Sequence, residues 1–444
     1  MNSPLMATFR TPDLRKKIFY VLGIIVLYRI GATLPSPGVD FKEINRCVDA
    51  ASQGDSGQIY SLINMFSGGA LLQLSVFAIG IMPYITASII VQLLTVVIPR
   101  FEQLRKEGQS GQTKMTQYTR YLTVALAILQ STGIVALAAS GNLLPSTGAD
   151  CNSKEIISDT SILGLTIIVL VMTAGACLVM WFGELITERG VGNGMSMLIF
   201  AGIVARLPSE GRNILQQRGG LVFGILIVAI LLILVAVVFI EQGMRRIPVQ
   251  YAKRMVGRKM YGGSSTYMPI KVNTAGVIPV IFASSLLYIP QLILQVTNQN
   301  QTDVSGWQVW IQENLVNPSS PFHIVFYFLL IVFFTYFYVA VTFNPEERAD
   351  DMKRYGGFIP GIRPGRPTAE YLSYVLNRIT LPGSLYLGLI SILPNLFLDM
   401  GGSNGAANIP FGGTALLIIV AVGLDTIKQV NSQLMQRKYE GFLK

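Results

Sequence analysis

Charge is scarce in this sequence, and so are the residues on which most enzyme active sites depend. Only 13% of the 444 residues are charged, and the chain has one histidine and three cysteines. With His323 alone, most zinc sites and most catalytic triads are excluded, and the cysteines lack metal-ligand and redox spacing. The sequence therefore predicts no metal site, no cofactor and no enzymatic activity. The sequence does not decide whether Cys47 and Cys151 form a disulfide.

Polar surface is also too small for a soluble globule, because 51% of the residues are hydrophobic. A membrane-spanning helix needs about 20 apolar residues. Ten such runs are present, and they predict an all-α polytopic membrane protein with ten transmembrane helices. The predicted spans are 18–34, 74–98, 121–139, 161–182, 190–207, 221–240, 274–296, 321–343, 374–398 and 411–427.

The N-terminal residues run directly into the first apolar stretch without a small-residue cleavage site, so the first span is predicted to be retained. Lysine and arginine predict the orientation, since they concentrate in cytoplasmic segments. If the N-terminus is cytoplasmic, 26 of the 34 basic residues fall in inside segments. The distribution predicts a multi-pass protein of the cytoplasmic (inner) membrane with both termini in the cytoplasm.

One short pattern occurs twice. AIGIMPYITAS at 78–88 and TAGVIPVIFAS at 274–284 both read G-x-x-P-x-I-x-A-S. Each lies in the second span of a five-span half, and an odd number of spans gives the two halves opposite orientations, as in an inverted-topology repeat. Glycine and proline are also common in membrane helices, so the sequence leaves a true repeat and a chance match both open.

Ionisable residues are missing from the centres of the spans, although a transporter usually keeps such groups there for function. Whatever passes through these spans is therefore not recognised by a fixed charge. Three classes remain open at this point: a passive channel, an ion-coupled secondary transporter built on inverted repeats, and a structural scaffold without a pathway.

Residues 59–72, IYSLINMFSGGALL, are too short to cross a bilayer and too apolar for an ordinary exterior loop. This length is typical of a re-entrant segment, which is tolerated only where it is buried in protein or lines a water-filled cavity. Glycines 68 and 69 supply a flexible joint or allow close packing. The sequence does not distinguish a movable stopper from a static packed loop.

Two predicted cytoplasmic loops have an unusual composition. The loop at 241–273 holds seven basic residues and a single acid, Glu241, while the loop at 344–370 interleaves glycine and proline with Arg363 and Arg366. Glycine and proline favour a shaped turn over a solvated linker. The basic side chains suit the phosphates of RNA, the acidic surface of a partner protein or anionic lipids.

Several motifs match one known family in order and spacing. They include MFSGGAL, FAIGIMPYITASIIVQLL, ITERGVGNGMSM, KVNTAGVIP and FNPEERADDMKRYGGFIPGIRPG, and the chain resembles the SecY family over nearly its whole length. SecY is the channel subunit of the bacterial protein translocase. The resemblance implies two inverted five-helix halves around a central hourglass pore that passes unfolded polypeptides and releases hydrophobic segments sideways into lipid.

The resemblance also implies site residues, which fall into four groups. The pore ring is expected at Ile81, Ile85, Met195, Ile199, Ile281 and Ile418, with Met195 in doubt because the family usually has a branched aliphatic residue there. The plug is expected at Leu62, Asn64, Met65, Phe66, Ser67, Gly68 and Gly69. The lateral gate is expected at Pro83, Thr86, Ser88, Gln92, Pro279, Ser284 and Ser285. Docking of a motor or ribosome is expected at Arg245, Arg246, Lys253, Arg254, Arg258, Lys259 and Arg363.

The implied partners are the subunits SecE and SecG, the SecA ATPase motor, the ribosome, polypeptides that bear signal sequences, and anionic lipids. Because the chain has no GxxxxGK[ST] motif, energy must come from a partner. The predicted organisation is a cytoplasmic N-terminal segment, a first half containing the plug, an outside loop with span 6, a basic loop, the rest of the second half and a cytoplasmic tail. Their bounds are 1–17, 18–207, 208–240, 241–273, 274–427 and 428–444.

Overall fold

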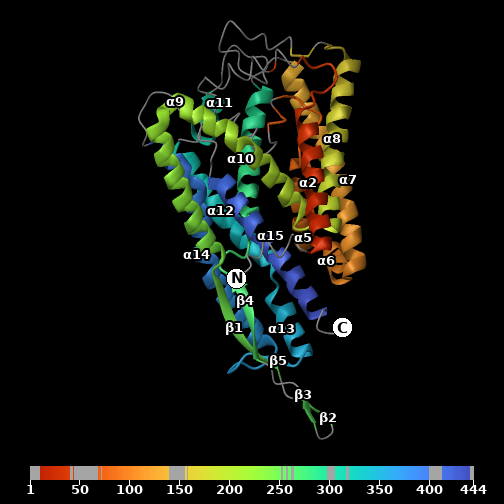
Figure 1. Cartoon of the computed structure of the whole chain (residues 1–444), viewed down its shortest axis with the longest axis vertical. Coiled ribbons are helices and arrows are strands. Elements are labelled where there is room, and N and C mark those ends of the chain that lie inside the picture. Colours follow the sequence, from red (N-terminus) through yellow and green to blue (C-terminus); the bar gives the residue numbers. More distant parts are fainter. Residues whose placement is uncertain are drawn as a thin grey trace. The chain divides into compact units, whose positions relative to one another are not determined.

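A computed structural model gives the arrangement of most of the chain (Figure 1). It describes residues 11–40, 44, 69–71, 73–139, 156–157, 159–251, 254–256, 259–261, 265–297, 306–316, 320–399 and 413–440. The described part is mostly helical. Packing divides the chain into two compact units, residues 1–226, 292–308 and 398–444 in the first and residues 227–291 and 309–397 in the second, and each is described by itself.

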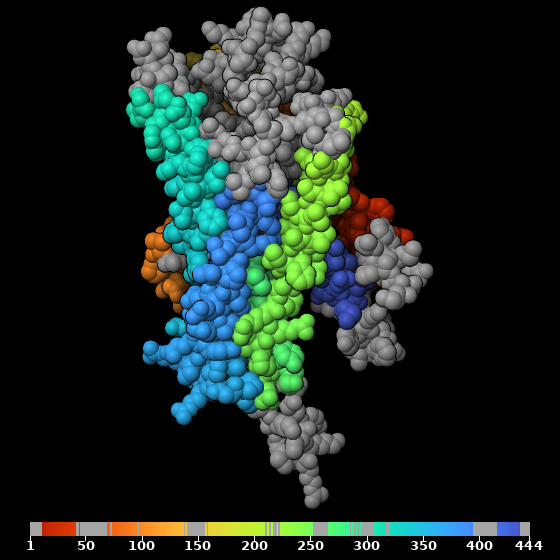
Figure 2. All heavy atoms as spheres, turned by 90° about the vertical axis from the view of Figure 1, so that its left-hand side faces the viewer, coloured from red at the N-terminus to blue at the C-terminus, as the bar shows by residue number. Residues whose placement is uncertain are grey.

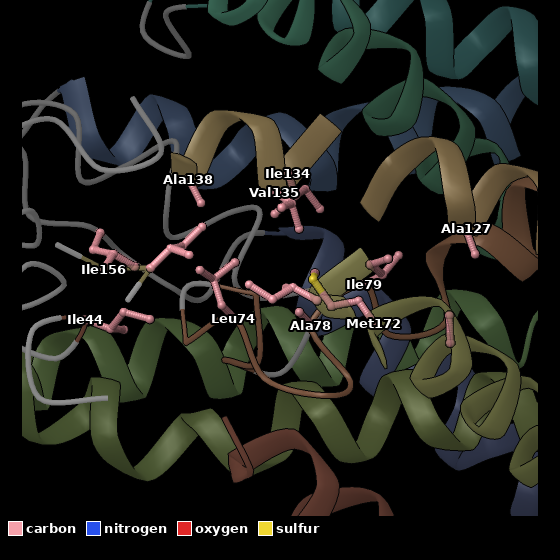
Figure 3. Packing of buried hydrophobic residues seen from close by; sticks show 13 residues of the cluster. Ile44, Leu74, Ala78, Ile79, Ala127, Ile134, Val135, Ala138, Ile156 and Met172 are labelled. Carbon is pink, nitrogen blue, oxygen red and sulfur yellow. The ribbon is translucent and has the colours of Figure 1, made fainter. Parts of the chain in front are cut away.

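The first unit is built from long helices around an apolar core. α5 packs against α7, α7 against α8, and α2 against α8. The core draws Leu74, Ala78 and Ile79 from the segment before α5, Ile134 from α7 and Met172 from α8 (Figure 3). The helices are α2 (Pro12–Thr33), α5 (Met82–Val97), α6 (Pro99–Lys106), α7 (Gln109–Ala139), α8 (Ile162–Arg189), the first part of α9 (Gly194–Glu241) and α15 (Gly413–Glu440).

The second unit combines helices with a small sheet. α12 and α14 lie side by side (Figure 2), and Phe328 of α12 fills the space beside Gly388 of α14. The sheet lies at one end of these helices and has the order β4-β1-β5. The strands are β1 (Met244–Tyr251), β2 (Arg254–Val256), β3 (Lys259–Tyr261), β4 (Ser265–Lys271) and β5 (Gly357–Phe358). The helices are α12 (Pro321–Thr342), α13 (Pro345–Arg354) and most of α14 (Arg366–Asp399), with the π-helix η2 (Gln312–Val316).

Two further helices, α10 (Ile278–Thr297) and α11 (Gly306–Ile311), cross the boundary between the units. The boundary also falls inside α9. Because α15 packs into the first unit, the two compact units do not coincide with the two five-span halves expected from chain order.

Each of the ten predicted apolar runs corresponds to helical residues, but several bounds differ. Within the described ranges, six helices are long and apolar enough to cross a membrane, or seven if the bent pair of α5 and α6 is one span. The expected loop at 208–220 is helical instead, because α9 continues from Gly194 to Glu241 with Pro208 inside it. Apart from Pro208 and the glycines, the residues at 208–220 are compatible with a helix. The two apolar stretches of α9 remain distinct, at Gly194–Pro208 and Phe223–Glu241.

Candidate functional site

The repeated G-x-x-P motif has the same local structure in both places. Gly80 and Gly276 have positive φ angles of 60° and 64°, a conformation that favours glycine. α5 then begins at Met82 and α10 at Ile278, so that Pro83 and Pro279 fall in the first turn, where a missing N–H leaves no hydrogen bond unmade. The motif is therefore a helix-start signal used twice.

This geometry corrects two expectations. The helices begin at 82 and 278, later than the expected starts at 74 and 274, because a residue with positive φ cannot lie within a right-handed helix. The expected spans also placed Pro83 and Pro279 inside helices, where a proline frees a backbone acceptor and bends the helix. In the first turn they do neither, and α10 has a different interior proline, Pro290.

The segment before α5 is held in a narrow passage between two helices. The Val76 N–H donates to the Leu34 carbonyl over 2.9 Å, and the Ser36 N–H donates to the Leu74 carbonyl over 3.1 Å. On one side the Phe77 ring occupies the space beside Gly31 of α2. On the other side the Val76 carbonyl lies where a Cβ at Gly175 of α8 would be. The start of the predicted gate helix α5 is thus fixed by backbone contacts.

We expect Gly175→Ala to destabilise the protein, because the added methyl group meets the Val76 carbonyl, which belongs to backbone and cannot rotate away. Overpacking of this kind costs about 1–3 kcal/mol. Thermal unfolding of the purified protein measures the effect. Gly133→Ala in α7 is the matched control, since nothing lies within 4 Å of its added Cβ. Equal melting temperatures for the two variants would contradict the tight passage.

Five of the six predicted ring residues lie in the first unit. Ile81 precedes α5 and is 2% exposed, and Ile85 follows one turn later, with its N–H 3.2 Å from the Ile81 carbonyl. Residues four apart lie on the same helix face. Ile199 of α9 and Ile418 of α15 are also buried. The sixth residue, Ile281 of α10, belongs to the second unit.

Met195, the uncertain ring residue, has a described neighbour. Its sulfur occupies the space beside Gly183, where a Cβ would meet it, so the side chain packs onto α8. The backbone of Gly194 also lies against the Gly183 carbonyl. α8 and α9 approach closely at Gly183 and Gly194, and Met195 packs between the two helices at this point.

Two hydroxyls of the predicted gate bond to the backbone of their own helices. The Thr86 hydroxyl donates to the Met82 carbonyl over 3.0 Å, and the Ser284 hydroxyl donates to the Val280 carbonyl over 2.8 Å. Ser284 is also 3.1 Å from the Tyr327 hydroxyl of α12. Ser88 and Gln92 are half-buried on α5, and the side chain of Ser285 lies outside the described residues. Hydroxyls that bond to their own backbone present no fixed recognition group.

Most of the predicted plug lies outside the described residues, namely Leu62, Asn64, Met65, Phe66, Ser67 and Gly68. Gly69 is described, in a turn with φ of 97°. The space beside it is bounded by the Arg206 guanidinium, 3.6 Å from the position of a Cβ. Cys47 and Cys151 also lie outside the described residues, and Cys177 is a free thiol.

The two predicted cytoplasmic loops form one structured surface. Strands β1 and β4 of the first loop pair antiparallel, and β1 also pairs with β5 of the second loop through Gln250 with Phe358 and Tyr251 with Gly357. Alternate side chains anchor the sheet, since Ile247 is buried against Leu372 of α14. We call the strands β1, β4 and β5 together with the turn 359–365 the docking sheet.

Arg245, Arg246 and Arg363 are all exposed on the docking sheet. The turn that carries Arg363 lies between Gly361 and Gly365, which both have positive φ, and the Thr368 hydroxyl donates to the Arg363 carbonyl over 2.9 Å. Of the remaining docking residues, Arg254 and Lys259 lie in the β2–β3 hairpin, whereas Lys253 and Arg258 lie outside the described residues.

An ion pair between α7 and α8 was not anticipated from the sequence. Arg120 donates two hydrogen bonds of 2.8 Å to the two carboxylate oxygens of Glu184. Such a two-bonded pair fixes orientation as well as distance. The two residues are 64 positions apart and lie beside the ends of predicted spans, so no local pattern indicated their contact. Among the described residues, no group of three or more potential metal-ligating side chains occurs.

These elements define a multi-pass helical membrane protein with apolar helices and a basic sheet. The family model for SecY matches residues 75–427. The protein translocase subunit SecY of Mycobacterium tuberculosis (strain H37Rv) is 67% identical over 446 residues, and that of Corynebacterium glutamicum is 62% identical over 445 residues, each across 100% of both chains. The chain belongs to the SecY family, and its function is that of a protein-conducting channel subunit in a membrane.

Solved structures support the fold. A protein-conducting channel aligns with a TM-score of 0.62 and 19% identity, covering 94% of this chain and 91% of that chain. Sec61 in a canine ribosome–channel complex aligns with a TM-score of 0.59 and 18% identity. At these identities the likeness concerns the fold, and it confirms the predicted all-helical, polytopic fold class. The secondary transporter and the scaffold are not favoured.

Proposed function

We propose that polypeptide passes this channel through a ring formed by Ile81, Ile85, Ile199, Ile281 and Ile418, with Met195 packing behind or beside it. The observation that carries the proposal is chemical. The isoleucines offer no charge and no hydrogen-bonding group, and Ile81 and Ile418 are each 2% exposed. An aliphatic constriction excludes ions by dewetting. It also fits any passing side chain without selecting one.

The two halves of the lateral gate are proposed to be α5 and α10, which share the glycine–proline start. Pro83, Thr86, Ser88 and Gln92 lie on one helix, and Pro279, Ser284 and Ser285 on the other. Hydrophobic segments of a substrate leave sideways between these helices into lipid. Residues 59–72 serve as the plug, and of these the structure describes residues 69–71.

The docking sheet is proposed as the receptor for the SecA motor or the ribosome. Its support is a fixed backbone that carries exposed arginines, because a rigid basic surface attracts RNA phosphates or acidic protein surfaces. In this arrangement the sheet faces the cytoplasm of a cell with both termini inside, as the distribution of basic residues indicates. SecE and SecG complete the membrane complex, and anionic lipids contact its basic loops.

A photoreactive residue at position 85 tests the pathway directly. We expect it to crosslink to the mature region of a secretory chain that is stalled halfway through export. The same probe at Val97, which is 74% exposed at the end of α5, is the control and should not crosslink to the stalled chain. If position 85 gives no crosslink while the complex docks its motor, the ring assignment is wrong.

A further inference from the structure

A buried carboxylate lies at the junction between α9 and the docking sheet. Glu241 is the last residue of α9 and is 8% exposed. Asn273, which follows β4, is 4% exposed. A buried charge is costly unless hydrogen bonds and other charges compensate it. The sole acid of a strongly basic segment, 241–273, is therefore held inside the second unit.

The Asn273 side chain connects two helices. Its amide nitrogen donates to a Glu241 carboxylate oxygen over 2.6 Å and to the Gly276 carbonyl over 3.1 Å. Glu241 ends α9, and Gly276 is the positive-φ residue from which α10 begins. One amide group thus fastens the start of the predicted gate helix to the end of the preceding membrane helix.

The same junction continues the docking sheet. The Val272 N–H donates to the Gly243 carbonyl over 3.0 Å, one step beyond the paired residues Met244 and Lys271. On the opposite side, Gly383 brings the α14 backbone against the junction, since a Cβ there would lie 2.6 Å from the Val272 carbonyl oxygen. A shift of the β1–β4 ladder therefore cannot occur without displacing Asn273.

The junction buries polar atoms whose hydrogen bonds are incompletely satisfied. Within the part of the chain that the structure describes, the Asn273 side-chain oxygen and the Tyr386 hydroxyl are buried without a hydrogen-bond partner. Tyr386 belongs to α14, and its hydroxyl lies within the electrostatic field of the Glu241 carboxylate. Incompletely satisfied buried networks are unfavourable for stability alone, which favours a role in geometry.

We propose that Glu241 and Asn273 are a positioning pair that transmits displacement of the docking sheet to the start of α10. The inference rests on the proposed function, in which the sheet receives the motor and α10 forms one side of the gate. All the contacts that carry it lie within the second unit. Motor binding moves the β1–β4 ladder, and the Asn273 amide carries that movement to the turn at Gly276.

An environment-sensitive dye on α10 provides the test. Leu286, which is 40% exposed, is replaced by cysteine in a full chain whose three native cysteines are serine, within the assembled translocase in lipid vesicles. Motor affinity is measured in parallel on the same vesicles. For the otherwise unchanged chain we expect motor binding to change the dye signal.

Asn273→Ala is expected to reduce the population that responds by about ten-fold, the ratio that corresponds to ~1.4 kcal/mol, while motor affinity is retained. Glu241→Gln keeps an oxygen that accepts from the Asn273 amide, so its response should exceed that of Glu241→Ala. Thr274→Ala is the matched control. It removes a hydrogen bond to the Lys271 carbonyl at the same junction without reaching α9, and the response should be unchanged.

The possible outcomes distinguish failure of the positioning pair from failure of the proposed function. If the unchanged chain binds the motor but gives no dye response, the assignment of the docking sheet and α10 fails, and the pair fails with it. If the unchanged chain responds and Asn273→Ala responds equally, only the pair is overturned. Parallel loss of motor affinity, thermal stability and dye response in Glu241→Gln also overturns it, because that result indicates a purely structural role.

Discussion

Replacing both Ile85 and Ile281 with glycine is expected to raise the resting ion conductance of the channel by at least about ten-fold. Burial of one isoleucine side chain contributes about 1.5–3 kcal/mol, and ~1.4 kcal/mol changes a population ten-fold. Removing two such side chains from the seal both weakens the closed arrangement and widens a constriction that excludes ions by dewetting. Conductance in planar bilayers without substrate measures the effect.

The control makes the same kind of substitution, an aliphatic residue to glycine, at exposed positions of the same two helices. Val97→Gly in α5 and Leu286→Gly in α10 remove side chains that are 74% and 40% exposed from the same two helices. This double variant should conduct as the unchanged channel does. An equally low conductance in both double variants would show that Ile85 and Ile281 do not form the constriction.

Reversing the charge of Arg363 should abolish motor-driven export and leave folding intact. Arg363 is exposed on the turn between Gly361 and Gly365, and substitutions at exposed positions usually change stability by no more than about 0.5 kcal/mol. Loss of one partner from a desolvated charge pair costs about 2–5 kcal/mol of binding, which is more than ten-fold in affinity. Export into vesicles carrying Arg363→Glu measures the result.

Arg366→Glu is the matched control on the same segment. Arg366 begins α14, its side chain is 91% exposed, and it pairs with Glu370 over 3.3 Å, so its charge is already engaged within the chain. We expect export to be largely retained in this variant. Normal export with Arg363→Glu would refute the assignment of Arg363 to motor docking.

Features encoded by nearby residues could be predicted from the sequence. The ten apolar runs all fall on helical residues, two of them on the single helix α9. The shared G-x-x-P motif proved to mark equivalent helix starts, although its physical meaning was misjudged. A proline three residues after a positive-φ glycine begins a helix, whereas the sequence interpretation placed Pro83 and Pro279 inside one. Knowledge of the glycine φ angles was needed to make that distinction.

Contacts between distant residues could not be predicted. Gln250 pairs with Phe358 across more than a hundred positions, and Arg120 meets Glu184 only because α7 and α8 pack together. A signal for the sheet was nevertheless present, since Ile247 and Val249 alternate with exposed residues in β1, as expected for a strand with one buried face. The composition of that loop was interpreted through its charges, and the alternation was overlooked.

The passage that holds Val76 against Gly175 also constrains the order in which the protein acquires its structure. The two residues are 99 positions apart, and the close contact requires α8 to be present. At a synthesis rate of about 5–20 residues per second, Gly175 emerges roughly 5–20 seconds after Val76. During that interval the residues that precede α5 lack one wall of their final site. Until α8 has entered the membrane, the residues before α5 in the newly made chain therefore lack their packing contact with α8.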